Sequence, residues 1–144
     1  MNIKKALKEK NKKIKEVNEY FSKMSQYNSV EVGEKRPYSA KEMMEKWKQS
    51  VDDLITLKTK IHLANVSVYG KIFRLAELKS MVSNLKSLSC YEGKSTPNRW
   101  SSDERQVMES EITVTERDEM IKALETEIEK IQDELDIHNG MTEI

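Results

Sequence analysis

The sequence predicts an all-α protein made of long antiparallel helices with coiled-coil-type packing. Four separate segments repeat apolar residues at alternating steps of three and four, which places them on one stripe of a helix. Charged residues make up 35% of the chain and its mean hydropathy is −0.75, values that suit helices with one apolar stripe and a solvated remainder. A chain of 144 residues can build one modest core. We therefore expect a single helical domain, residues 1–144, that forms a homo-oligomer to bury more apolar surface.

The first helix is predicted over residues 2–26. Its stripe comprises Ile3, Leu7, Lys10, Ile14, Val17, Phe21 and Met24. The helix is expected to end near Asn28 and Ser29, whose side chains offer the backbone alternatives to helical hydrogen bonds. Residues 29–32 then alternate with period two, as do residues 111–114, so these two segments are predicted to pair as a short β-ribbon.

The second helix is predicted over residues 40–66. Ser39 and Glu42 match a capping box, in which each side chain accepts a hydrogen bond from a free backbone N–H. The stripe of this helix comprises Met44, Trp47, Val51, Leu54, Lys58, Ile61 and Asn65. A second apolar row of Leu54, Leu57, Ile61 and Ala64 widens the stripe, which indicates contacts with two neighbours.

The third and fourth helices are predicted over residues 71–89 and 115–139. Their stripes comprise Leu75, Leu78, Val82 and Leu85 in the third helix and Ile121, Leu124, Ile128, Ile131, Leu135 and His138 in the fourth. Thr113 and Glu116 match a capping box before the fourth helix, and Asn139 and Gly140 are typical of a helix end.

The charges are balanced overall but unevenly distributed. Net charge is zero, which argues against binding to nucleic acid through bulk electrostatics. Residues 1–16 are rich in Lys, whereas residues 116–144 are rich in acids. We expect the first and last helices to attract one another. A nucleic-acid-binding arm in the first helix is the weaker interpretation.

The sequence indicates a soluble, cytoplasmic protein without a membrane partner. Cys90 is the single cysteine, so no internal disulfide is possible and a reducing compartment fits. The N-terminal segment lacks the apolar region of a secretory signal. No apolar run is long enough to span a bilayer as a helix.

The residues also favour a non-enzyme without metal or cofactor. His62 and His138 lack the Glu-x-x-His spacing of di-iron helical bundles. The lone Cys90 has no base close in sequence to activate it. The four glycines are scattered and form no phosphate-binding loop. Polar residues within the stripes, such as Lys10 and Asn65, are best explained as register residues, although Asn65 is also a candidate ligand contact.

Several polar and aromatic side chains near the predicted helix ends are candidates for binding a small polar ligand. They are Asn65, Tyr69, Lys71, Arg74, Arg99, Trp100 and Arg105. An indole face beside a guanidinium group can stack on a base and bind a phosphate, which favours a nucleotide-like ligand. The alternative is structural, with Trp100 packing over a helix end and Arg99 pairing with surface acids.

Several non-periodic segments resemble a known family. They are residues 28–34, Ile61 to Asn65, Arg99-Trp100-Ser101, Glu111-Ile112 with Val114, and the ending 139–144. In these segments the chain is similar to the septicolysin-like proteins, small helical proteins of bacteria and their phages. The family has Arg-Tyr-Ser near residues 99–101 and an Asn-Trp-Thr-Thr-Glu-Leu ending. Its Arg-Arg-Asp motif falls on residues 79–81, where this chain has Lys-Ser-Met.

The resemblance implies an all-helical, coiled-coil-rich oligomer. The family name suggests membrane lysis, which the residues do not favour because no helix has the amphipathic Trp/Phe face that lysis requires. The function expected from the sequence is a non-catalytic homo-oligomer that binds a nucleotide-derived signal between subunits. By analogy alone, a phage anti-defence protein that sequesters such a signal would fit. The alternative is a purely structural or protein-interaction coiled-coil module.

Overall fold

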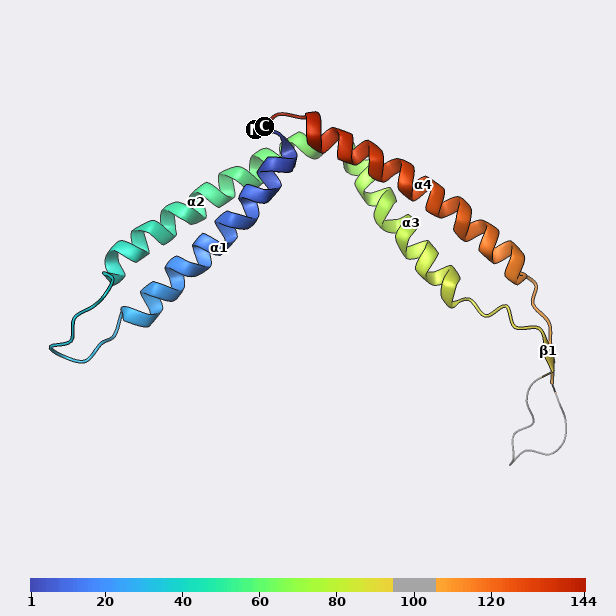
Figure 1. Cartoon of the computed structure of the whole chain (residues 1–144), viewed down its shortest axis with the longest axis horizontal. Coiled ribbons are helices and arrows are strands. Elements are labelled where there is room, and N and C mark those ends of the chain that lie inside the picture. The colour runs from blue at the N-terminus through green and yellow to red at the C-terminus, as the bar shows by residue number, and fades with distance from the viewer. Residues whose placement is uncertain (95–105) are drawn as a thin grey trace, which may run out of the picture. The chain divides into compact units, whose positions relative to one another are not determined.

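The computed structural model describes residues 1–94 and 106–144 and shows the predicted all-α architecture (Figure 1). The helices are α1 (Ile3–Tyr27), α2 (Ala40–Asn65), the 3₁₀ turn η1 (Val66–Val68), α3 (Tyr69–Ser87) and α4 (Val114–Met141). Within the described residues the strands are β1 (Gly93–Lys94) and β2 (Val107–Met108). The four α-helices begin and end within two residues of the ranges that the sequence predicts.

Local capping explains where the helices begin. The Ser39 hydroxyl accepts a hydrogen bond from the Glu42 backbone N–H at 3.3 Å and so caps α2. The predicted capping box before α4 is complete. Thr113 Oγ1 accepts from the Glu116 N–H at 3.2 Å, and Glu116 Oε2 accepts from the Thr113 N–H at 3.3 Å.

The predicted ribbon between residues 29–32 and 111–114 is wrong. Residues 29–32 form bends and a turn that leads into Gly33, whose φ of 91° is the left-handed conformation that glycine adopts most easily. Thr113 serves the α4 cap, so the backbone there is committed to the helix start. A two-stranded antiparallel ribbon is formed instead by β1 and β2, with Gly93 opposite Met108. Period-two alternation over four residues was too short a signal to identify a strand.

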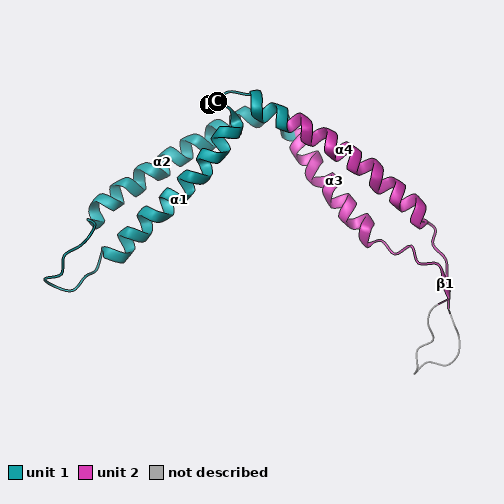
Figure 2. Ribbon diagram, in the orientation of Figure 1, with its two compact units in different colours: residues 1–69, 136–144 teal, residues 70–135 magenta. Residues whose placement is uncertain are grey.

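The chain divides into two compact units (Figure 2). Unit 1 comprises Met1–Tyr69 and Asp136–Ile144, and unit 2 comprises Gly70–Leu135. In unit 1 the antiparallel helices α1 and α2 lie side by side as a hairpin. The start of α1 is also joined to the end of the chain, because the Ile3 N–H donates to Thr142 O at 3.0 Å and the Asn2 side chain donates to Gly140 O at 2.9 Å.

The seam of the α1/α2 hairpin follows a heptad pattern whose phase differs from the predicted one. Buried or half-buried residues at heptad spacing on α1 are Ile3, Ala6, Lys10, Lys13, Val17, Tyr20, Met24 and Tyr27; on α2 they are Ala40, Met43, Trp47, Ser50, Leu54, Leu57, Ile61 and Ala64. Five of the seven members of each predicted stripe are buried or half-buried. The other two members, Ile14 and Phe21 on α1 and Met44 and Lys58 on α2, lie beside the seam and are exposed.

In unit 2 the predicted stripes are confirmed. Leu78 and Val82 of α3 are buried, as are Ile131 and Leu135 of α4, and the other stripe members are half-buried. Near the start of α4, the guanidinium of Arg117 donates a hydrogen bond to the backbone oxygen of Leu88, which follows α3, at 3.2 Å. Cys90 follows and is buried with a free thiol.

Candidate functional site

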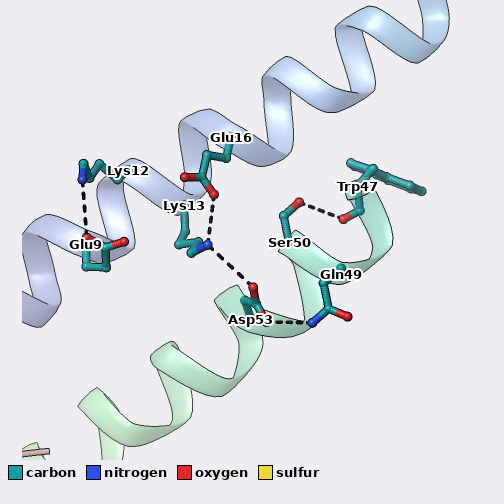
Figure 3. Close-up of polar contacts among 8 residues, drawn as sticks. All are labelled: Glu9, Lys12, Lys13, Glu16, Trp47, Gln49, Ser50 and Asp53. Atoms are coloured by element: carbon teal, nitrogen blue, oxygen red, sulfur yellow. Dashed lines mark hydrogen bonds and ion pairs between the residues drawn. The ribbon is translucent and has the colours of Figure 1, made fainter. Parts of the chain in front are cut away.

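One face of the α1/α2 hairpin is charged and tied together by ion pairs (Figure 3). The ammonium group of Lys13 lies 3.0 Å from Glu16 on its own helix and 3.6 Å from Asp53 on α2. Gln49 donates to the same Asp53 carboxylate at 2.9 Å. The hydrogen bond to Glu16 is the main reason that the pKa of Lys13 lies above its ordinary value of 10.5, and Asp53 adds to the shift. This face is therefore a structural clasp between the two helices.

The opposite side of α1 is uncharged. Two residues of a helix correspond to about 200° of rotation, so Leu7 and Ile14 point away from the charged Glu9 and Glu16. A row at helical spacing follows this side, which we call the outer row of α1: Leu7, Asn11, Ile14, Asn18, Phe21, Ser25 and Asn28. Ile14 is 37% exposed and Phe21 is 49% exposed. In a chain that is 35% charged, a charge-free row over most of a helix is unusual.

The matching row on α2 lies on the same face of the hairpin. The outer row of α2 comprises Lys41, Met44, Lys48, Val51, Ile55 and Lys58. Phe21 and Met24 of α1 line one open groove together with Lys41 and Met44 of α2, which shows that the two rows flank the same side of the seam. The Phe21 ring also lies 5.7 Å from that of Trp47, centroid to centroid. The two rows together form what we call the outer face.

Two of the predicted ligand residues are engaged in ion pairs inside unit 2. Lys71 Nζ lies 2.8 Å from Glu134, and Arg74 lies 2.6 Å from Glu127. The hydrogen bond from Lys71 holds the pKa of Glu134 below its ordinary value of 4.5. Both cations thus join α3 to α4. This arrangement resembles the structural alternative proposed above for Arg99, in which a cation pairs with surface acids instead of a ligand.

Two others, Asn65 and Tyr69, belong to unit 1. The Tyr69 hydroxyl lies 2.6 Å from Nδ1 of His62, and the two rings are tilted with centroids 5.2 Å apart. Asn65 is half-buried, and its Oδ1 atom is buried with no hydrogen-bond partner in the structure. Such an acceptor usually costs stability unless something donates to it. The remaining candidates, Arg99, Trp100 and Arg105, lie outside the described residues.

Among the described residues, neither a metal-binding group nor a membrane-spanning helix is present. Within residues 1–94 and 106–144, no group of three or more His, Cys, Asp or Glu side chains could hold a metal ion. In the same part of the chain, no helix combines the length and the apolar character that crossing a bilayer requires. His138 is half-buried in the α4 stripe, with Nδ1 3.1 Å from the Thr142 hydroxyl.

Comparisons with protein-family models, curated proteins and solved structures find no match for this chain. The class of protein that the fold and the outer face define is a helical-hairpin protein. The resemblance to septicolysin-like proteins stays a prediction from the sequence.

The sequence analysis did not identify the outer face as a site. Its signal was partly present, because the second apolar row predicted for the second helix, with Leu57 and Ala64, already made that stripe wider than a single helix pair needs. Ile14 and Phe21 were assigned to the seam, whereas the structure leaves them exposed beside it; Leu7 in the same row is half-buried. The His62–Tyr69 contact was also missed, although seven residues separate the two, which places them on one helical side.

Proposed function

We propose that this protein is a non-catalytic helical module that works as a homo-oligomer. The observation that carries the proposal is the outer face, because two neighbouring helices of one hairpin expose apolar side chains there in register. Contiguous exposed apolar surface on helices marks a binding surface for other helices. Its position on regular helices, rather than around a cleft with convergent polar groups, favours association over catalysis.

Sedimentation velocity and native mass spectrometry over a concentration range of about 1–100 µM test this proposal. We expect the mass to rise from one chain to a defined multiple as concentration increases. A chain that remains monomeric over the whole range contradicts a homo-oligomer. The native masses also report any small molecule that co-purifies with the assembly.

A second candidate function is binding of a small polar, nucleotide-derived ligand by the assembled protein. The observation that favours it is the buried, unpartnered Oδ1 of Asn65, which one turn of helix separates from Tyr69. A ligand N–H group would satisfy this acceptor, and the tyrosine ring offers a face for stacking. The role of a phage anti-defence protein that sequesters such a signal belongs to this candidate.

Thermal unfolding against a panel of linear and cyclic nucleotides tests the ligand candidate. A binding nucleotide raises the Tm, because ligand binding stabilises the folded state by RT ln(1 + [L]/Kd), where [L] is the free nucleotide concentration, and Asn65→Leu is expected to abolish the rise. Without ligand, Asn65→Leu is expected to stabilise the protein by about 1 kcal/mol because it removes a buried unpaired acceptor. If no nucleotide raises the Tm at saturation, the ligand candidate fails and the association proposal stands alone.

The candidate residues outside the described part of the chain need their own test. Arg99→Ala and Trp100→Ala remove the predicted base-stacking pair, whereas Ile61→Asp places a charge in the buried seam of unit 1. If biological activity survives the first two variants and is lost with the third, helix packing carries the function. Loss with Arg99→Ala and Trp100→Ala in a folded chain supports ligand binding.

A further inference from the structure

We infer that the occupant of the outer face is the outer face of a second copy, with α1 of each copy lying on α2 of the other. This inference rests on the proposed homo-oligomer and specifies its geometry. The resulting dimer core is a four-helix bundle in which every helix has antiparallel neighbours.

The width of the apolar stripe is the first argument. A helix that contacts one partner needs only the two seam rows, whereas a helix in a bundle uses three rows. Helix α1 has the third row, with Leu7, Ile14 and Phe21, and α2 has it in Met44 and Val51. Each hairpin therefore carries the apolar pattern of half a bundle.

The available area fits a stable dimer. Helix α1 has 25 residues, which at 1.5 Å per residue is about 38 Å long. Two adjacent helices are about 20 Å wide, so two such faces in contact bury about 1,500 Å² in total. This is close to the size of a standard specific interface, about 1,600 Å².

The distribution of charge selects the arrangement. The outer row of α1 has no charge from Leu7 to Asn28, whereas the outer row of α2 contains three lysines: Lys41, Lys48 and Lys58. If α2 lay antiparallel on α2 of the second copy, with Val51 near Ile55 of that copy, Lys48 would face Lys58 across the interface and the like charges would repel. Placing α2 on the neutral row of α1 avoids this repulsion, and the long lysine side chains can reach water at the edges.

The same arrangement matches the apolar side chains in register. A twofold axis parallel to the helices keeps every residue at its own level along the hairpin. Phe21 and Met44 share a level because they line one groove, so Phe21 would meet Met44 of the second copy. Ile14 lies two turns before Phe21 and Val51 lies two turns after Met44, so Ile14 would meet Val51 of the second copy.

Mixed disulfide cross-linking tests the register. One chain carries Ile14→Cys and a second, distinguishable by a tag, carries Val51→Cys, both in a Cys90→Ser background. Mild oxidation of the mixture is expected to give mainly the cross-linked heterodimer, because each chain alone has no cysteine opposite its own. Efficient cross-linking of Ile14→Cys chains with one another would indicate that α1 lies on α1, and the inferred arrangement would be overturned.

Charge substitutions on the outer face test the surface itself. Ile14→Glu and Met44→Glu, measured separately, are each expected to weaken self-association by at least about tenfold, since each buries a charge in the interface. The matched control is Leu63→Glu, because Leu63 is an apolar α2 residue, 65% exposed, that lies about 200° around the helix from the seam residue Ile61. Circular dichroism confirms that each variant keeps its helix content.

The outcomes separate this inference from the proposed function. A wild-type chain that stays monomeric overturns both, and the occupant of the outer face is then another part of the chain or another protein. An oligomer that persists unchanged in Ile14→Glu and Met44→Glu leaves the proposed function standing and overturns the inferred surface. If the glutamate variants unfold, the cross-linking result decides, since cysteine is tolerated better than glutamate at such positions.

Discussion

The two helical pairs of this protein use different means to hold their helices together. The seam between α1 and α2 contains Lys10, Lys13 and Ser50, while Ile14 and Phe21 remain beside it and exposed. The seam between α3 and α4 is apolar along most of its length, with Leu78, Val82 and Ile131 buried. A helix pair that places polar groups in its own seam and apolar groups beside it is built for a further partner.

The surfaces beside the two helix–helix seams also differ in their charge. The flank of α3 and α4 that holds Met81 and Met120 also holds the ion pair between Arg74 and Glu127, since each methionine lies seven residues from one of these partners. It is a mixed surface. The outer face of unit 1 has no acid in either row, which is the reason the proposed association is placed on unit 1.

The largest expected effect comes from the apolar seam of unit 2. Leu78→Ala is expected to lower the free energy of unfolding by about 2–4 kcal/mol, because Leu78 is buried and its truncation removes apolar contacts and leaves a cavity. Lys10→Ala at a seam position of α1 is the matched comparison and is expected to change stability by less than about 0.5 kcal/mol. Urea unfolding followed by circular dichroism, at one fixed protein concentration, measures both. Equal losses would remove the distinction between the two seams.

The second prediction replaces a lysine in the seam of unit 1 with an apolar residue, so that this seam becomes more like that of unit 2. Lys10→Leu is expected to raise the free energy of unfolding by about 1 kcal/mol, because a half-buried seam position gains apolar burial and loses a charge that must reach water. The same urea experiment measures it. A fall in stability would mean that the Lys10 ammonium group stabilises the folded state by more than the leucine side chain does through apolar burial.

Periodicity predicted the helices and their ends, because each helix has strong repeats and recognisable caps. It could not choose between neighbouring rows in unit 1. Leu7 and Ile14 are more apolar than Ala6 and Lys13. A prediction based on hydrophobicity therefore assigns Leu7 and Ile14 to the seam. In the structure Ala6 is fully buried, because small residues such as Ala6 and Ser50 let two helices approach closely, and this depends on the partner helix. In α3 and α4 no competing apolar row exists, so the predicted stripes there are confirmed.

The candidate ligand residues show a similar limit. The sequence placed Lys71 and Arg74 near one another at the start of a helix but could not show that Glu134 and Glu127 lie opposite them. The acid-rich last helix was expected to attract the Lys-rich first helix, whereas these acids pair with α3. The number of acidic and basic residues predicted that ion pairs would form between helices. The choice of partner depends on which helices fold side by side.

The third prediction tests the clasp of unit 1 at alkaline pH. The folded state raises the pKa of Lys13 above 10.5, so the resulting stability is fully present below that pH and is lost as the pH rises through the raised pKa. Lys13→Met is therefore expected to show a smaller loss of stability above pH 10.5 than the wild type. Unfolding midpoints in urea measured across this range give the difference. Lys12→Met, on the exposed side of α1, should follow the wild-type profile, and a shift of equal size in that control would rule out a specific role for Lys13.

The smallest expected effect lies in the ion pairs of unit 2. The hydrogen bond from Lys71 lowers the pKa of Glu134 below 4.5, so its contribution is present above that pH and is lost as the pH falls through the lowered pKa. Glu134→Gln is expected to be slightly less stable than the wild type at neutral pH, and the difference should vanish in acid. Glu129→Gln, an exposed acid on the same helix, is the control and should show no such convergence.

A double-mutant cycle with Lys71→Met decides whether this acid-dependent difference comes from the pair. In the Lys71→Met background, Glu134→Gln should have no pH-dependent effect, because the donor that lowers the pKa is gone. A difference that survives without Lys71 would have to come from another cation, of which Lys130 is the one that also acts on this carboxylate. The Lys71–Glu134 pair would then add little to the stability of unit 2, and the apolar seam with the pairs of Arg74 and Lys86 would hold α3 and α4 together. Either result locates the stability of unit 2 between its own helices, whereas the proposed self-association of unit 1 would make its stability depend on protein concentration.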